Sequence, residues 1–369
     1  MKILVINHQA RPEFSGVASH FENISKNLLA LGCEVVRLVA KDPAFVKKNK
    51  KIEYHYFNYD KKNPKQTKLE NEKRVKMNYA NFEKSLKELN WKKIDAVITS
   101  NDIYLSILKK YIAPEKMLAI IPSSLTFSKT SNPKGYLDVI KRLKKNAKGV
   151  RLIVLSDKMK GMLSALLGEK YKIDIVPPGV DHSRFSIKEA PKKKNQILFV
   201  GRVSKEKNVE ALINAMSLVK TNCSLTIVGK GDSFEKVIAL AKKNGLEDKV
   251  IFTGRQEKVE RYYTQASLFI LPSRYEAFGL VILEAMSSGL PVIAFHPSKK
   301  ILTASDEIID DNVDGFLVKN TKEMAEKIDF LMANKKILKR MGEKALLKSK
   351  KYTWPNHTQN LLNLLTNTK

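Results

Sequence analysis

Residues 271–286 read LPSRYEAFGLVILEAM, and this stretch decides the fold class. An apolar strand pattern ends at Pro272, a polar loop follows, and a helical pattern begins near Gly279. The backbone N–H groups at the start of a helix have no intrahelical partner, and the helix dipole adds positive potential there. Strand, loop and helix in this order therefore predict an anion site at the carboxyl end of a parallel strand.

Two carboxylates lie on either side of this helix start. Glu284 falls about one and a half turns into a helix whose other members are almost wholly apolar. Because an unpaired buried carboxylate is costly, we expect it to meet a donor such as a sugar hydroxyl, and a salt bridge to a lysine is the structural alternative. Glu276 precedes the helix and is able to face the same crevice, or it is an ordinary exposed loop acid.

A second strand-to-helix turn reads GRVSKEKN over residues 201–208. Gly201 permits a tight exit from the strand before it, and Arg202 and Lys207 would converge where a ligand sits. In a chain this rich in lysine, solvated surface charge is the alternative interpretation.

Short β-rich runs alternate with helical periodicity along nearly the whole chain, which indicates parallel sheets covered on both faces. A stretch rich in proline, glycine and lysine at residues 176–195 separates two such sets. We therefore expect an α/β protein with two doubly wound, Rossmann-like parallel-sheet domains that face each other across a cleft. The expected strands are residues 2–6, 34–39, 52–57, 94–99, 117–121, 151–155 and 172–176 in the first set, and 196–201, 224–229, 249–253, 268–271, 291–295 and 315–318 in the second.

The formal net charge of +29 indicates phosphate-rich partners. Residues 41–93 alone carry 16 Lys and Arg against 7 Asp and Glu. Three interpretations stay open: an anionic membrane face or lipid-linked acceptor, a nucleic acid, and a merely solvated lysine-rich surface. Lysine is far more frequent than arginine. This composition suits a nonspecific positive electrostatic field better than hydrogen bonding to nucleic acid bases, so we expect no nucleic acid partner. The aromatic residues of the same stretch are Tyr54, Tyr56, Phe57, Tyr59, Tyr79, Phe82 and Trp91.

Cysteine and apolar content indicate a cytoplasmic protein. Cys33 and Cys223 lie in different halves of the chain, so neither a disulfide framework nor a cysteine metal site is expected. The apolar run at residues 1–6 is too short for a signal peptide, and no window has the roughly 18 uninterrupted apolar residues of a membrane span. No Asp-x-Asp pair ends a strand and no His/Asp cluster is evident, so we expect no metal.

The paired glutamates, with seven residues between them, resemble the motif of retaining glycosyltransferase family 4. The segment EAMSSGLPVIA at residues 284–294 also resembles this family, as do VPPGVD at residues 176–181 and FTG at residues 252–254. The resemblance is dense from residue 176 to residue 318 and thinner before it. It implies the GT-B fold and a metal-independent hexosyltransferase that moves a sugar from a nucleotide diphosphate sugar with retention of the α linkage.

The resemblance also implies residue roles. Arg202 and Lys207 would neutralise the departing diphosphate, and Glu276 would contact the donor sugar; these three form the expected catalytic set. Glu284 would hold the ribose and Arg255 would lie by the base. No cofactor is implied, since the nucleotide sugar is a substrate, and a UDP-sugar is slightly favoured. The expected donor-binding residues are Gly16, Gly201, Arg202, Lys207, Gly254, Arg255, Glu276, Ala277, Phe278, Gly279, Leu280 and Glu284.

The chain departs from the family pattern at two places. Members often have a histidine after the strand at residues 117–121, where this chain has PSSLT at residues 122–126. The sugar-side contact usually ascribed to that histidine is therefore expected from Ser123 or Ser124, or from Asn101 and Asp102 in a neighbouring turn, and these four are the candidate acceptor-side residues. The usual glycine pair before a Glu-Ile-Val segment is replaced by SKKILTAS at residues 298–305.

We therefore expect an acceptor-binding domain at residues 1–180 plus a returning helix at 352–369, and a nucleotide-sugar-binding domain at 181–351. The expected acceptor is an anionic glycan or lipid-linked molecule in the synthesis of cell-envelope lipopolysaccharide, glycolipid or polysaccharide, reached through peripheral contact with the inner face of an anionic membrane. The alternative is a catalytically idle basic binding protein on the same fold.

Overall fold

The computed structural model describes residues 1–7, 16–41, 49–60, 67–100, 104–121, 133–186 and 195–367. The chain divides into two compact units. Unit 1 comprises Met1–Leu155, Met159–Val176 and Trp354–Lys369, and unit 2 comprises Ser156–Lys158 and Pro177–Thr353. The main part of unit 2 thus begins four residues before the expected boundary and ends two residues after it.

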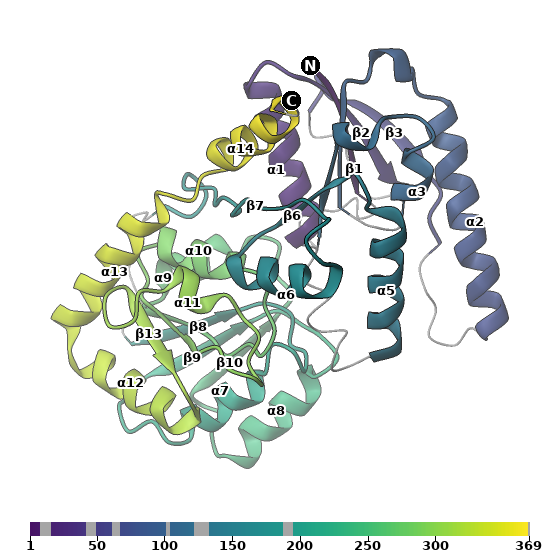
Figure 1. The fold of residues 1–369 in the computed structure, drawn as a ribbon. Coiled ribbons are helices and arrows are strands. Elements are labelled where there is room, and N and C mark those ends of the chain that lie inside the picture. The colour runs from purple at the N-terminus through teal and green to yellow at the C-terminus, as the bar shows by residue number, and fades with distance from the viewer. Residues whose placement is uncertain are drawn as a thin grey trace. The chain divides into compact units, whose positions relative to one another are not determined.

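Among the described residues, unit 1 contains a seven-stranded sheet in the order β3-β2-β1-β4-β5-β6-β7 (Figure 1). Every strand pair is parallel. Residues Ile3–Ile6 of β1, which has a strand on either side, are wholly buried, as expected for a parallel sheet with helices on both faces. The strands are β1 Lys2–Asn7, β2 Glu34–Ala40, β3 Glu53–Phe57, β4 Ala96–Thr99, β5 Met117–Ile120, β6 Arg151–Val154 and β7 Ile173–Ile175.

The last helix of the chain packs on the first one, side by side in Figure 1. Phe21 and Leu28 of α1 share one buried cluster with Leu361 and Leu365 of α14. Gly32 follows α1 with a φ of +83°, a left-handed conformation that glycine adopts without strain, and it ends the helix as expected. The helices are α1 Gly16–Ala30, α2 Lys68–Lys87, α3 Leu105–Leu108, α5 Pro133–Asn146, α6 Asp157–Leu167 and α14 Trp354–Thr366.

A buried histidine pair joins α1 and α14. The Nε2 atoms of His20 and His357 lie 2.9 Å apart, and the ring of Trp354 lies 5.1 Å from that of His20. Burial, and then the nearby His357, holds the pKa of His20 well below its ordinary value of 6.5. The unfolded chain therefore binds more protons than the folded one below that pH. The contribution of this histidine to the stability of unit 1 is therefore fully present above about pH 6.5, its ordinary value, and decreases as the pH falls below it.

We expect the melting temperature of unit 1 to fall on acidification below about pH 6.5, the ordinary histidine value. Both tryptophans, Trp91 and Trp354, belong to unit 1, so tryptophan fluorescence reports its unfolding. A double His20→Leu/His357→Leu variant should have a shallower acid dependence. The same change at the exposed His296 of unit 2 should leave the dependence intact, and a slope that survives the double substitution contradicts this assignment.

Among the described residues, unit 2 contains a six-stranded sheet in the order β10-β9-β8-β11-β12-β13. All of its strand pairs are parallel. The strands are β8 Gln196–Val200, β9 Ser224–Val228, β10 Val250–Gly254, β11 Leu268–Leu271, β12 Val292–Phe295 and β13 Gly315–Val318, and the helices are α7 Val209–Met216, α8 Phe234–Lys243, α9 Glu260–Gln265, α10 Leu280–Ser287, α11 Ser305–Ile308, α12 Thr321–Ala333 and α13 Lys335–Ser349.

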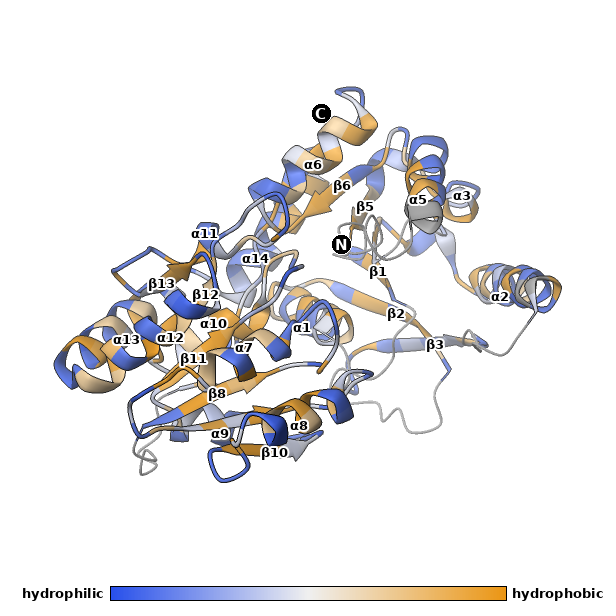
Figure 2. Cartoon of the chain, turned by 90° about the horizontal axis from the view of Figure 1, so that it is seen from below, coloured by the Kyte–Doolittle hydropathy of each residue, from blue (hydrophilic) through white to orange (hydrophobic). Residues whose placement is uncertain are grey.

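Each expected strand corresponds to one observed strand, and the expected pair of parallel α/β sheets is confirmed. Figure 2 shows why the patterns were informative: β8 and β11 are coloured hydrophobic, whereas α13 alternates hydrophobic and hydrophilic residues. A strand that is buried on both sheet faces needs a continuous run of apolar residues. A helix that is buried on one face needs apolar residues only at the positions that recur on that face.

Candidate active site

The loop between β11 and α10, at the carboxyl end of β11 in the unit 2 sheet, is held in place by backbone hydrogen bonds. The amide of Glu276 donates to the carbonyl of Leu302 at 3.1 Å, and the amide of Leu302 donates to the carbonyl of Arg274 at 2.7 Å. Gly279 precedes α10 with a φ of +93°, where any side chain would be strained. Within the described residues, the N–H groups of Phe278, Gly279 and Leu280 have no acceptor, which makes them suitable for an anion.

Lys207 and Glu276 form an ion pair at this loop. Both side chains are largely buried, with exposed fractions of 20% and 12%, so solvent screens the pair only in part. Ser273 Oγ donates to the same Glu276 oxygen, Oε1, at 3.0 Å. Because Lys207 Nζ carries three donors and Glu276 has a second oxygen, each group retains bonding capacity for a ligand.

The turn between β8 and α7 is tied to the β11–α10 loop by its backbone. The amide of Arg274 donates to the carbonyl of Glu206 at 2.8 Å, and Asn208 Nδ2 donates to the carbonyl of Pro272 at 3.1 Å. Asn208 itself has a φ of +55°, which asparagine tolerates better than most residues. These bonds tie the two turns together where Lys207 meets Glu276.

Arg202 occupies a different environment from Lys207. Its guanidinium lies 3.4 Å from Glu206, and its side chain is 69% exposed. An exposed pair of this kind contributes little to stability, so the side chain is free to reorient toward an arriving anion.

Glu284 is partly buried in α10, and its Oε2 accepts a hydrogen bond of 2.7 Å from the hydroxyl of Tyr263 in α9. Tyr263 is fully buried. Burial raises the pKa of Glu284 above its ordinary value, and the bond from Tyr263 opposes this rise. The ion pair between Arg184 and Glu260 lies close enough to affect the same carboxyl. Tyr263 thus fixes one oxygen of Glu284 and leaves the other for a ligand.

We expect Tyr263→Phe to shift the pH dependence of nucleotide binding. A protonated Glu284 accepts hydroxyl donors less well, so affinity falls as the pH decreases through the pKa of this carboxyl. Removal of the Tyr263 donor raises that pKa further, and the loss of affinity should begin at a higher pH than in the wild type. Titration of UDP, GDP and ADP against pH measures the shift, with Tyr262→Phe as the matched control. An unshifted profile refutes a role for Tyr263 in the charge state of Glu284.

The remaining expected site residues are distributed as follows. Gly201 directly follows β8 with a φ of +154°, Gly254 ends β10 with a φ of +64°, and Arg255 is exposed beyond Gly254. Gly16 begins α1 in unit 1. The expected acceptor-side residues Asn101, Asp102, Ser123 and Ser124 lie outside the described residues.

Sequence reasoning missed the residues that position the site, namely Tyr263, Ser273 and Asn208. Tyr263 follows an amphipathic pattern and resembles an ordinary core aromatic. Its hydroxyl finds Glu284 only because α9 and α10 meet in space. For Asn208 a weak signal existed, since asparagine directly before a helix is typical of a cap or a left-handed residue.

The described residues contain no cluster of three or more His, Cys, Asp or Glu side chains arranged to hold a metal ion. Over the same residues, no helix combines the length and apolar character needed to cross a bilayer.

Comparison with known proteins gives two family models on adjoining parts of the chain. Residues 14–184 match the model of glycosyltransferase family 4, and residues 182–348 match the model of glycosyl transferases group 1. An uncharacterized glycosyltransferase of Haemophilus influenzae is 33% identical over 161 residues, 42% of this chain and 44% of that protein. The poly(glycerol-phosphate) alpha-glucosyltransferase of Bacillus subtilis is 26% identical over 180 residues, 47% of this chain and 26% of that protein.

The matched stretch spans less than half the length of these curated relatives. Among solved structures, WaaG, a glycosyltransferase involved in lipopolysaccharide biosynthesis, superimposes with a TM-score of 0.76 at 19% identity, covering 99% of this chain and 100% of that one. At this identity the likeness shows the fold. The fold, with its two Rossmann-like parallel sheets, is thus of the GT-B class. The chain belongs to glycosyltransferase family 4.

Proposed function

We propose that this chain transfers a sugar from a nucleotide diphosphate sugar to an acceptor, with unit 2 binding the donor. The observation that carries the proposal is the junction of two loops at one sheet edge. At that edge Lys207 pairs with Glu276, which belongs to the loop that also carries the amides of Phe278, Gly279 and Leu280, for which the described residues offer no acceptor. A cation beside free N–H groups and a helix start suits a diphosphate, and a carboxylate suits sugar hydroxyls.

The proposed chemistry needs charge stabilisation more than covalent catalysis. The bond between the anomeric carbon and the diphosphate oxygen breaks, a bond to the acceptor oxygen forms, and the acceptor hydroxyl loses its proton. Negative charge grows on the departing diphosphate. Lys207, the free amides and the reoriented Arg202 would stabilise that charge without reorganising solvent. Glu276 would hold the sugar through its free oxygen, and Glu284 would hold the ribose.

Retention of the α linkage is part of the proposal and rests on family membership. Glu276 is engaged by Lys207 and Ser273 through Oε1, an arrangement that suits sugar binding. With the donor that the enzyme accepts, proton NMR of the fresh product should give the small anomeric coupling of an α linkage. A β product would contradict retention.

The acceptor is proposed to be an anionic glycan or lipid-linked molecule of the cell envelope, bound by unit 1 with help from Asn101, Asp102, Ser123 and Ser124. The net charge of +29 supports an anionic acceptor. Among the relatives, one acts on poly(glycerol-phosphate) and one is involved in lipopolysaccharide biosynthesis. A UDP-sugar is the proposed donor.

Helix α2 supports a further proposal, peripheral contact with an anionic membrane. On one face it exposes Leu69 and Met77, at 62% and 47%, between the exposed lysines Lys73 and Lys76. Such a surface combines charge attraction with shallow apolar insertion. The aromatic residues of the stretch contribute less than their number indicates, because Phe57 and Phe82 are buried in the core.

We expect the protein to sediment with anionic vesicles at low salt and to be released as salt rises, since screening weakens attraction between exposed charges. The triple variant Lys73→Glu/Lys76→Glu/Lys84→Glu should lose most of the binding. The control Lys336→Glu/Lys344→Glu/Lys350→Glu changes net charge equally on unit 2 and should bind as the wild type does. Equal loss of vesicle binding in both variants would show that net charge alone drives the binding. A wild-type protein that does not bind anionic vesicles at low salt would contradict the proposal.

A second candidate function is a basic binding protein that retains the fold without turnover. The replacement of the family histidine by PSSLT at residues 122–126 favours it. Such a protein would bind nucleotide sugars and leave them intact, which separates it from the transferase.

A further inference from the structure

The short segment Ser156–Lys158 belongs to unit 2, although the residues before and after it belong to unit 1. Ser156 follows β6, and its hydroxyl donates a hydrogen bond of 2.9 Å to the carbonyl of Ala277. Ser156 and Ala277 are both buried, with exposed fractions of 1% and 6%. Ala277 lies in the loop whose amides are proposed to bind the diphosphate, so this contact reaches the donor site from a distant part of the sequence.

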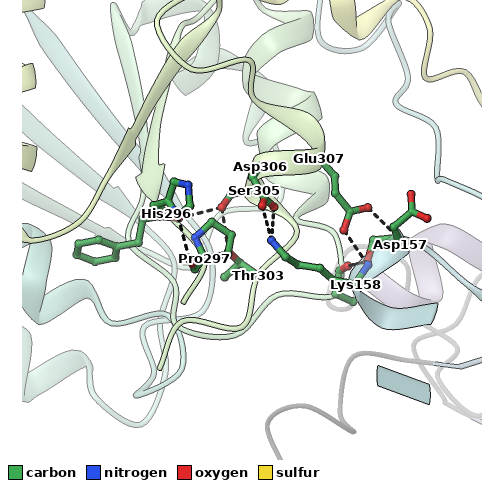
Figure 3. A network of polar contacts seen from close by, with 11 residues as sticks. Asp157, Lys158, His296, Pro297, Thr303, Ser305, Asp306 and Glu307 are labelled. Atoms are coloured by element: carbon green, nitrogen blue, oxygen red, sulfur yellow. Dashed lines mark hydrogen bonds and ion pairs between the residues drawn. The ribbon is translucent and has the colours of Figure 1, made fainter. Parts of the chain in front are cut away.

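Two acidic residues of α11 hold this segment in place (Figure 3). The carboxylate of Glu307 accepts from the amides of Asp157 at 2.7 Å and Lys158 at 2.9 Å, and Lys158 Nζ pairs with Asp306. These amides begin α6, where a carboxylate interacts favourably with the helix dipole.

Helix α11 is in turn anchored to the sheet. The hydroxyl of Ser305, at its first position, donates to the carbonyl of Phe295 at the end of β12 at 2.9 Å. Ser305 is itself buried, at 2% exposure, so this bond is shielded from water. The position of Ser156 is therefore fixed by a connected set of polar contacts that ends on the sheet.

The contact of Ser156 determines how one peptide group of the donor loop is turned. The Ala277–Phe278 peptide is trans, since the described chain contains no cis bond. In a planar trans peptide the C=O and N–H groups point in opposite directions. When Ser156 holds the Ala277 carbonyl, the Phe278 N–H must point away from Ser156, and it has no acceptor among the described residues.

We propose that Ser156 is a positioning residue of the donor site, which turns the Ala277–Phe278 peptide so that the Phe278 N–H donates to the diphosphate of the bound nucleotide. This inference rests on the proposed function and goes beyond it, because it assigns a role to a residue outside the paired-glutamate segment. Without the Ser156 hydroxyl, the carbonyl loses its partner and the peptide is free to rotate. The diphosphate then loses the oriented hydrogen-bond donor that the Phe278 N–H would provide.

The test compares the binding of a nucleoside diphosphate with that of its nucleoside. UDP is titrated first, with GDP and ADP as further probes, and uridine, guanosine and adenosine are measured by competition. Ser156→Ala should weaken nucleoside diphosphate binding about tenfold, the usual size for a lost hydrogen bond to a charged group. It should change nucleoside binding less than about twofold, because the peptide faces the phosphates.

Two further variants guard against a packing effect. Ser156→Cys keeps the volume but is a poor donor and should lose affinity like Ser156→Ala, whereas Ser156→Thr keeps the hydroxyl and should retain it. Ser349→Ala is the matched control, since Ser349 is also buried and bonds the carbonyl of Leu346 at 2.8 Å in α13. It should leave nucleotide binding unchanged.

Glu307→Gln adds an independent check, because it acts through Ser156. In the Ser156→Ala background it should cause no further loss of nucleoside diphosphate affinity. Equal weakening of nucleoside and nucleoside diphosphate, or no weakening in either Ser156→Ala or Ser156→Cys, overturns the inference and leaves the proposed function standing. A wild-type protein that binds none of the three nucleoside diphosphates overturns both.

Discussion

Replacing Lys207 by alanine is expected to slow sugar transfer about 100- to 1000-fold, the usual effect of removing one preorganised group that stabilises developing charge. Lys207 is the largely buried cation of the site and pairs with Glu276. Its loss removes the charge that faces the departing diphosphate and also releases Glu276 from its partner. The rate at saturating donor should fall more than the affinity for the donor, because the charge grows in the transition state.

Lys205→Ala provides the control for this prediction. Lys205 lies two residues away in the same turn and is exposed, so its removal changes net charge equally without touching the site. It should transfer sugar at the wild-type rate. Melting temperatures of both variants check that the fold is intact. Undiminished turnover in a folded Lys207→Ala variant would remove this lysine from the mechanism.

Replacing Glu284 by glutamine should weaken nucleoside diphosphate binding about 10- to 100-fold, which corresponds to the loss of charge-assisted hydrogen bonds. The substitution keeps the shape of the side chain and an oxygen that is able to accept from Tyr263. It removes the carboxylate that would accept the ribose hydroxyls. Because an amide is neutral at every relevant pH, the acid-dependent loss of affinity should disappear as well.

Titration calorimetry with UDP, GDP and ADP measures this effect, and Glu247→Gln, at an exposed position, is the control. Comparison with the free nucleosides shows which part of the nucleotide loses its contact. A weakened nucleoside places the contact at the ribose, whereas an unchanged nucleoside would contradict the assignment of Glu284.

The fold was predictable because its two sheets are parallel and buried. Strands such as β8 and β11 are continuous apolar runs, and Gly32 and Gly279 mark where a helix ends and where another begins. These are local signals. The sequence predicts a helix that begins near Gly279, and α10 begins at the next residue, Leu280.

The site was predictable only where its residues lie on the strand-to-helix turns. Lys207 and Glu276 both lie on such turns, and the structure joins them in an ion pair that the sequence does not show. Tyr263 and Ser156 could not be found, because their partners Glu284 and Ala277 are distant in sequence and the contacts depend on tertiary packing. Nor does residue type show that Arg202 turns outward to Glu206 while Lys207 turns inward.

The most direct test of the central proposal is release of nucleoside diphosphate from a panel of UDP-, GDP- and ADP-sugars, measured for the wild type and Lys207→Ala. We predict that the wild type turns over at least one donor, with water or an envelope glycan as acceptor, and that Lys207→Ala does so about 100- to 1000-fold more slowly. A wild type that binds donors and leaves all of them intact would contradict the transferase and favour the idle binding protein.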